Sequence, residues 1–277
     1  MNKTVLSILL LLCALPSSLS AYDFVVDGVY YSITDKRRRT VEVTHWEEAT
    51  AETGTPLRVM HHVCGPECHH DHTHDHLSRQ QRQLLQMDED AVERERTAYR
   101  GEVTIPEQVR YKGRTYTVMG IGDGSFYMRK QLTEVFLPSS ITYIGRCAFS
   151  NCSALRNIQL PSNIQRIGMA AFRRCMSLTT MILPDSLSSI GIYAFAFCER
   201  LESINIPEKV DTFPGNIVFH CVQMKSITLP HTIPPVVDNN NGLKMDFRNI
   251  VFEVRKEALP AYRSDTYWGK QHVNVSH

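Results

Sequence analysis

The sequence lacks an excess of charge of either sign, since its 277 residues include 30 Lys and Arg against 29 Asp and Glu. A protein that binds mainly nucleic acid needs a basic surplus to displace counterions from phosphates, so this function is disfavoured. Simple attraction to an anionic membrane is disfavoured for the same reason. The sequence also lacks GxSxG and HExxH motifs and a convincingly placed pair of carboxylates. We therefore expect no catalytic residues and no enzyme activity.

Long apolar runs are missing as well, except at the N-terminus. Lys3, the apolar stretch Val5–Leu15 and the small residues around Ser18–Ala21 together predict a cleaved export signal over residues 1–21. The stretch is too short to span a bilayer, which takes about 20 residues, and no later run is long enough. A lipoprotein would be modified at Cys13, but the preceding Leu12 is bulkier than such signals prefer. The sequence thus predicts an exported protein at the cell surface, in the periplasm or outside the cell.

The sequence has eight cysteines, and removal of the signal takes Cys13 with it, so an odd number is left. Seven cannot all pair, which argues against a complete disulfide framework.

A repeat organises the rest of the chain. Four blocks of 23 residues follow one another without gaps over residues 121–212. Each has Ile-Gly at its start, then one Phe, one Leu and one Pro at fixed offsets. The Phe positions are 126, 149, 172 and 195, the Leu positions 132, 155, 178 and 201, and the Pro positions 138, 161, 184 and 207. A degenerate fifth block completes 121–235, and an entry repeat with a hairpin insert occupies 99–120.

Alternation within a block predicts how its side chains are divided between core and surface. In LTEVFLP (132–138), Val135 and Leu137 would point inward while Glu134 and Phe136 point outward. The proline ends this strand, and ITYIG (141–145) predicts a second short strand on another face. The AFxxC segment predicts one helical or 3-10 turn that places Phe and Cys in the core. A single block cannot bury its apolar side, so the blocks must stack into a solenoid.

These blocks resemble the BspA-like leucine-rich repeat, whose unit reads LxxΦxΦPxxΦxxIGxxAFxxC with Φ apolar. The resemblance covers about 22–235 and, more loosely, the C-terminus. It implies a mostly β leucine-rich-repeat solenoid with short helical turns and capped ends, as found in exported surface proteins of Gram-negative anaerobes. It also implies binding to proteins or surfaces rather than catalysis. The departures, Arg129 for Cys, Phe213-Pro214 for Ile-Gly and Val218 for Phe, fall at the array ends, where capping repeats are expected to be atypical.

Both ends have the composition of caps. Residues 22–46 predict an N-terminal hairpin with its turn at Asp27-Gly28. The run Arg37–Arg39 is expected to be a solvated turn. In the C-terminal cap, 236–277, we expect a strand at 251–254 and a short helix within 256–269. Leu259, Tyr262 and Trp268 would close the open end of the core.

An insert at 47–98 separates the N-terminal cap from the repeats. Its segment 61–76 holds seven histidines and two cysteines in sixteen residues, the ligands that Zn, Ni or Cu prefer. The candidate ligands are His61, His62, Cys64, Cys68, His69, His70, His72, His74 and His76. The alternatives are a solvated His-rich loop and a disulfide joining Cys64 to Cys68. The segment 77–99 predicts a helix, either a partner helix, a lid or a mobile arm.

A ladder of four cysteines, one per block, invites a redox or metal interpretation. Neighbouring coils would bring these residues within reach of a disulfide. Buried free cysteine is nevertheless a common small apolar residue, and packing is the favoured interpretation for the ladder and for Cys147. The ladder consists of Cys152, Cys175, Cys198 and Cys221.

The outward positions of the first strand are the candidate ligand-binding face. They form two mostly uncharged rows, with two apolar residues near one end, and would suit a protein or glycan ligand. The candidates are Glu134, Phe136, Asn157, Gln159, Thr180, Ile182, Ser203 and Asn205, and the rows continue to Ser226 and Thr228. The alternative is a solvated strand face. The predicted function is non-catalytic protein binding or adhesion at the cell surface; divalent metal binding or sensing through 61–76 is the alternative.

Overall fold

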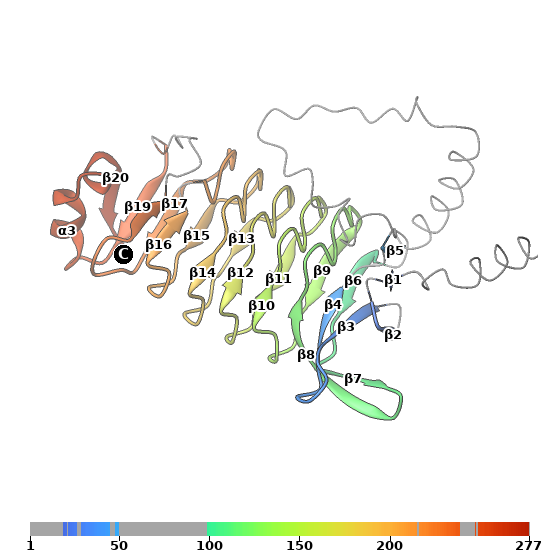
Figure 1. The fold of residues 1–277 in the computed structure, drawn as a ribbon. Coiled ribbons are helices and arrows are strands. Elements are labelled where there is room, and N and C mark those ends of the chain that lie inside the picture. Colours follow the sequence, from blue (N-terminus) through green and yellow to red (C-terminus); the bar gives the residue numbers. More distant parts are fainter. Residues whose placement is uncertain are drawn as a thin grey trace, which may run out of the picture.

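The computed structural model describes residues 22–26, 29–44, 99–214, 216–238, 247 and 249–276, and the backbone of 19–20 and 48–49. The predicted signal and the insert, apart from those short backbone stretches, lie outside the described residues. The described chain winds into a β-solenoid of stacked coils (Figure 1). Its secondary structure is mostly β, with one short α-helix near the C-terminus, as the repeat pattern predicts.

Each regular coil contributes a first strand of two to five residues and a second strand of two or three residues. The first strands and their continuations are β6 (Gly101–Thr104), β9 (Leu132–Phe136), β11 (Asn157–Gln159), β13 (Thr180–Met181), β15 (Ser203–Asn205) and β17 (Ser226–Leu229). The second strands are β10 (Tyr143–Ile144), β12 (Arg166–Ile167), β14 (Ser189–Ile190), β16 (Thr212–Pro214) and β18 (Val236–Asp238).

Pairing between coils is parallel and keeps the repeat register. Asn157 lies beside Glu134, and Ile167 lies beside Ile144, so each residue pairs with its equivalent 23 positions away. The first strands form a three-stranded sheet, β11-β9-β6, and a five-stranded sheet that begins β13-β15-β17. The sequence period therefore becomes the hydrogen-bonding register of the solenoid.

The N-terminal cap extends the sheet of second strands. A meander of β2 (Phe24–Val26), β3 (Val29–Asp35) and β4 (Thr40–Thr44) joins β8 (Arg114–Ile121), which leads into β10. The insert in the entry repeat is the expected hairpin, formed by β7 (Gln108–Tyr111) and β8. Val26 pairs with Val29 across the expected cap hairpin, whose turn residues lie outside the described part. A two-residue pair, β1 (Leu19–Ser20) with β5 (Glu48–Ala49), completes the N-terminal strands.

The AFxxC segments differ from the expected helical turn. They make hydrogen-bonded turns, such as Cys175 N–H to the Phe172 carbonyl at 3.1 Å, but no helix is assigned there. Backbone N–H groups instead donate to the next coil, as from Phe149 to Ala171 at 2.7 Å. Two turn positions per coil adopt positive φ, which breaks a right-handed helix. These positions include Cys147, Ala170 and Tyr193 in one column, and Met128, Asn151, Arg174, Phe197 and His220 in the other.

The core consists of columns that run along the solenoid. The four repeat phenylalanines are fully buried and stack with ring centroids 5.0–5.3 Å apart. Beside them, the ladder cysteines are buried, and each thiol lies 3.0–3.2 Å from the carbonyl of a phenylalanine in the preceding coil. The described cysteines form no disulfide. The packing interpretation of the ladder is therefore confirmed.

The C-terminal cap closes the other end of the core. β19 (Val251–Val254) coincides with the predicted strand, α3 (Leu259–Ser264) lies within the predicted helical segment, and η1 (Trp268–Lys270) ends one residue beyond it. Tyr262 and Trp268 are fully buried and Leu259 packs against the core, as predicted. The indole of Trp268 donates to the Pro235 carbonyl at 2.9 Å. A strand that the sequence analysis did not expect, β20 (His272–Val275), adds to the edge of the sheet beside β19.

Candidate binding face

The outward residues of the first strands stack into the two expected rows. Glu134 and Asn157 are register partners, as are Phe136 and Gln159, and Thr180 lies beside Ser203. Their inward neighbours are buried, so the alternation of each strand fixes which side chains face outward. The side chains of Phe136 and Ile182 are 46% and 80% exposed. The strand face therefore carries two accessible apolar side chains among polar ones.

Some of the predicted ligand-binding side chains already have partners within the protein. The Asn157 amide donates to the Glu134 carboxylate at 2.6 Å. The Asn205 side chain donates to the Leu183 carbonyl at 2.7 Å and accepts from the Leu183 N–H at 2.8 Å. Asn205 thus replaces strand pairing beyond the short strand β13. The Asn205 amide is therefore already bonded to the backbone. Thr180 and Ser203, by contrast, are exposed residues that present hydroxyl groups on this face.

The structure also extends the face beyond the residues chosen from the sequence. Glu102 of β6 pairs with Glu134, and Glu253 of β19 pairs with Thr228. The Thr228 hydroxyl donates to the Glu253 carboxylate at 3.1 Å. The strand face therefore has carboxylates toward both ends and uncharged side chains in between. The sequence could have revealed Glu102, because it belongs to the entry repeat at 99–120. Glu253 could not be found in this way, because it lies beyond the end of the sequence repeat.

A polar groove of about 620 Å³ lies over the second strands, and sequence analysis missed it. The Tyr143 hydroxyl donates to the carboxylate of Glu42 in the cap. Burial, with this hydrogen bond, raises the pKa of the Tyr143 phenol. The Arg166 guanidinium lies 5.3 Å from the centre of the Tyr143 ring. Tyr143 and Arg166 share a repeat position, but only the fold brings Glu42 beside them.

An ion pair between Asp123 of the first repeat block and Arg146 of the second also lines this groove. Arg146 is paired with Asp123, with the Arg146 Nε and the nearer terminal nitrogen each 2.9 Å from Oδ2. Because each carboxylate in this groove is bonded to a neighbouring coil, these contacts join the cap to the first repeats. The polar side chains of this groove therefore bond mainly to one another across coils.

The ladder cysteines are unsuited to thiolate chemistry. Burial raises the pKa of the Cys152 and Cys221 thiols to about 12 and that of Cys175 and Cys198 well above the ordinary value. Thiolates are the nucleophiles and metal ligands of cysteine, and such thiols stay protonated at neutral pH.

The predicted metal ligands of the 61–76 segment all lie outside the described residues. Within the described ranges, no group of three or more His, Cys, Asp or Glu side chains is placed to hold a metal ion. The same part of the chain has no helix long and apolar enough to cross a membrane. Metal binding by the insert thus stays a prediction.

Comparison with known families decides the nature of the repeats. Residues 120–240 match the family model of the BspA type leucine rich repeat region in six copies. The repeat array belongs to this family. No curated protein matches the chain.

Solved structures of bacterial leucine-rich repeat proteins share the fold. The T. pallidum leucine rich repeat protein is 22% identical, with 84% of each chain covered and a TM-score of 0.56. A leucine rich cell surface protein from Faecalibacterium prausnitzii is 22% identical over 81% of this chain and 52% of its own, with a TM-score of 0.50. The pneumococcal vaccine antigen PcpA is 19% identical over 64% of this chain and 41% of its own, with a TM-score of 0.51. This chain therefore spans only about half the length of the last two.

Proposed function

We propose that this leucine-rich repeat protein is an exported, non-catalytic binding protein whose strand face contacts another protein at the cell surface. The observation that carries the proposal is the exposure of Phe136 and Ile182 among the stacked polar rows. Solenoids present extended regular surfaces of this kind to their ligands. Large apolar side chains surrounded by polar ones are also typical of the centres of protein interfaces.

The apolar pair favours a protein ligand over a glycan. Burial of an exposed apolar side chain contributes about 1.5–3 kcal/mol, which a partner with a complementary pocket would gain. The polar rows supply hydroxyl and amide groups for hydrogen bonds at the rim. Export is supported by the signal-like residues 1–21, and a surface location by the F. prausnitzii relative, which is described as a cell surface protein.

The test is binding of the mature protein to an array of purified extracellular proteins and a parallel glycan array. Ile182→Lys and Phe136→Lys, singly and together, are compared with Val222→Lys, whose side chain is 72% exposed in a turn outside the strand rows. We expect at least one protein on the array to bind with an affinity that falls tenfold or more in the double variant but stays unchanged in Val222→Lys. Equal loss in Val222→Lys, or binding that is confined to glycans, would contradict the proposal.

The composition of segment 61–76 supports metal binding as a second function. Its density of imidazole and thiol groups is the specific observation. The test is calorimetric titration of the mature protein with zinc, copper and nickel near neutral pH, beside a variant that lacks 61–76. Stoichiometric submicromolar binding that disappears with the deletion is expected. Weak binding of variable stoichiometry would reduce the segment to a solvated loop.

A further inference from the structure

Positive charge is concentrated at the N-terminal end of the solenoid, although the chain as a whole is nearly neutral. The turn between β3 and β4 contains the run Lys36–Arg39, and the β7–β8 hairpin carries three more cations at its tip. All seven side chains belong to exposed residues. We call this set the basic tip: Lys36, Arg37, Arg38, Arg39, Arg110, Lys112 and Arg114.

Strand pairing brings the two halves of the basic tip together. β4 is parallel to β8, so the start of β8 lies at the same end of the sheet as the β3–β4 turn (Figure 1). Thr117 of β8 pairs with Thr40 on one side and with Gln108 on the other. Its N–H donates to the Arg39 carbonyl at 2.9 Å. Neighbouring strands lie about 4.8 Å apart, so the cations of both hairpins gather at one end of the sheet.

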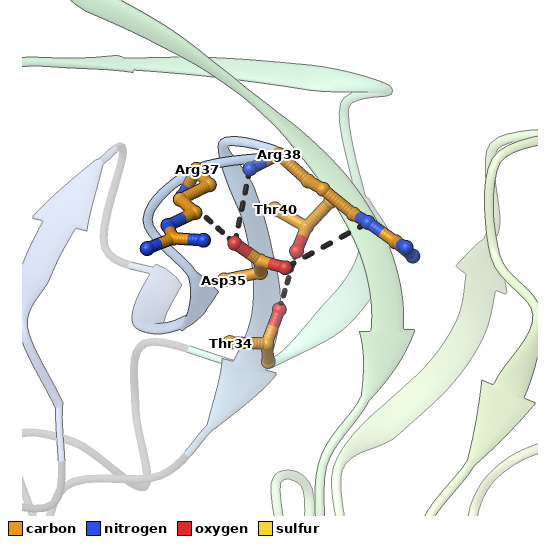
Figure 2. Close-up of polar contacts among 5 residues, drawn as sticks. All are labelled: Thr34, Asp35, Arg37, Arg38 and Thr40. Atoms are coloured by element: carbon orange, nitrogen blue, oxygen red, sulfur yellow. Dashed lines mark hydrogen bonds and ion pairs between the residues drawn. The ribbon is translucent and has the colours of Figure 1, made fainter.

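The β3–β4 turn is held in one conformation by its own polar contacts. Asp35 Oδ1 accepts hydrogen bonds from the backbone N–H groups of Arg37 at 2.7 Å and Arg38 at 3.0 Å (Figure 2). The hydroxyls of Thr34 and Thr40 are 2.8 Å apart across the turn. A ligand that binds the arginine side chains therefore does not have to order the backbone that carries them.

The charge of the basic tip is poorly neutralised by its surroundings. Within the described part of the chain, its one ion pair is between Arg38 Nε and Asp35 Oδ2, at 3.8 Å and largely exposed. Asp23 also lies near this end, and its carboxylate accepts the backbone N–H of Ile33. Arg37, Arg110 and Arg114 have no carboxylate partner among the described residues. Among the described residues, the carboxylates of Asp35 and Asp23 near this end are therefore already bonded to backbone N–H groups.

We propose that the basic tip binds an anionic glycan, one that carries sulfate or carboxylate groups along a soluble chain. Five of the seven cations are arginines, whose planar guanidinium groups pair with such anions through two parallel hydrogen bonds. Arg110 and Arg114 pair with Thr115 and Tyr111, so they lie on opposite faces of the β7–β8 ribbon. A flexible chain that passes around the tip can contact both faces, whereas a flat surface contacts one.

Single-stranded nucleic acid and membrane fit the tip less well. Single strands are bound through stacking of bases on free aromatic faces. The Tyr111 ring at the tip is stacked on Phe24 at 4.3 Å, and the Lys112 ammonium lies 4.9 Å from the ring centre. The two turn segments, 36–39 and 112–115, contain no large apolar side chain that could enter a bilayer.

The experiment measures binding of the mature protein to a heparin oligosaccharide of defined length and to an uncharged form of it, in which the sulfates are removed and the carboxylates are reduced to alcohols. The variant combines Arg37→Glu, Arg110→Glu and Arg114→Glu. The control makes the same change of charge at the exposed residues Lys209, Lys256 and Arg263, which are outside the N-terminal cap and the β7–β8 hairpin. A triple Arg→Gln variant of the tip repeats the test without introducing new carboxylates, and circular dichroism checks that each variant is folded.

We expect the tip variant to lose at least tenfold in affinity for heparin at 0.15 M salt, with a smaller dependence of affinity on salt concentration. The control should stay within about twofold. Three results would overturn the proposal: equal losses in tip and control variants, equal binding of the uncharged oligosaccharide, or tighter tip-dependent binding of a DNA duplex or of phosphatidylglycerol vesicles. Because the strand face is unchanged in these variants, their outcome is independent of the protein-binding proposal.

Discussion

Aromatic side chains fill both the regular array and the C-terminal cap, but with different geometry. In the array, four phenylalanines stack nearly parallel, with ring planes 2–7° apart. In the cap, rings meet edge to face at 66–82° with centroids 5.0–6.2 Å apart. The cap rings belong to Phe213, Phe247, Phe252 and Trp268.

Symmetry explains this difference. Successive coils are related by a translation of one strand spacing, so equivalent rings in identical surroundings must be parallel. The offset stack that results is one of the two favourable geometries for aromatic pairs. In the cap no translation relates the rings, and they adopt the edge-to-face alternative. Repetition thus restricts the packing of the array, whereas the cap residues are packed individually.

The largest expected effect is at the middle of the phenylalanine stack. Phe172→Ala should lower the free energy of unfolding by about 3–5 kcal/mol, because it leaves a cavity between two stacked rings. Phe247→Ala in the cap should cost less, since Phe247 is 3% exposed and meets Phe213 and Phe252 edge to face rather than lying between two parallel rings. Urea unfolding of both variants checks the difference. Equal losses would show that the stack packs no more tightly than the cap.

A smaller effect is expected where backbones of neighbouring coils approach closely. A Cβ at Gly168 would lie 2.6 Å from Arg146 N and Gly145 C, which belong to the adjacent coil. Gly168→Ala should therefore destabilise the protein by about 1–3 kcal/mol through overpacking. Ser189→Ala, at an exposed position, is the control and should change stability by less than about 0.5 kcal/mol. Thermal unfolding of the two variants suffices, and similar melting temperatures would refute the steric argument.

A polar substitution in the cysteine ladder should cost less stability at the end of the ladder than in its middle. Cys198→Ser replaces a buried thiol that contacts the Phe172 carbonyl at 3.1 Å. We expect a loss of about 1 kcal/mol, since the hydroxyl keeps this acceptor but is costly to bury. Cys221 is 8% exposed, so Cys221→Ser should cost less. Denaturant midpoints of the two variants make the comparison, and a larger loss at Cys221 would contradict it.

The smallest effect concerns pH and lies beside the C-terminal cap. His231 is buried, with Nε2 2.9 Å from the Val210 carbonyl, and burial lowers its pKa. The unfolded chain then binds a proton more readily than the folded one below the ordinary histidine pKa of about 6.5. Stability should therefore fall as pH decreases below that value, down to the folded pKa.

The groups facing His231 act in both directions. Glu208 and Asp211 favour the charged imidazole, and Arg255 opposes it. Urea unfolding at pH 5.5 and 7.5 should show a smaller pH dependence in His231→Gln than in the unchanged protein. The same slope in both proteins would assign the pH dependence to other groups.

The repeat made the coils predictable, but not the geometry of their turns. Ala170, Tyr193 and Phe197 adopt positive φ, which sequence rules expect of glycine or asparagine. The conformation follows from hydrogen bonds to the next coil, such as Phe197 N–H to the Phe219 carbonyl at 2.7 Å. A coil in isolation does not contain that acceptor. The helical turn expected from the local sequence was wrong for this reason.

The candidate surfaces show the same division. The outward rows could be predicted because strand alternation is local and the period fixes the register. That Asn205 bonds to Leu183 could not, because the contact depends on where the ladder between β13 and β15 ends, after the Met181–Ile204 pair. The basic tip was even harder to predict, because Arg37 and Arg110 are 73 positions apart along the chain. Only strand pairing brings them to the same end of the sheet.

The sequence by itself determined the coil, the direction of each strand side chain, the composition of the core columns and the presence of caps. All of these follow from local alternation and from a period that repeats without gaps. Only the tertiary structure decided the left-handed turns, the polar groove between Glu42 and Tyr143, and the basic tip. Each of these depends on contacts between segments that no local pattern connects, so its geometry is set by the stacking of coils and the attachment of the cap.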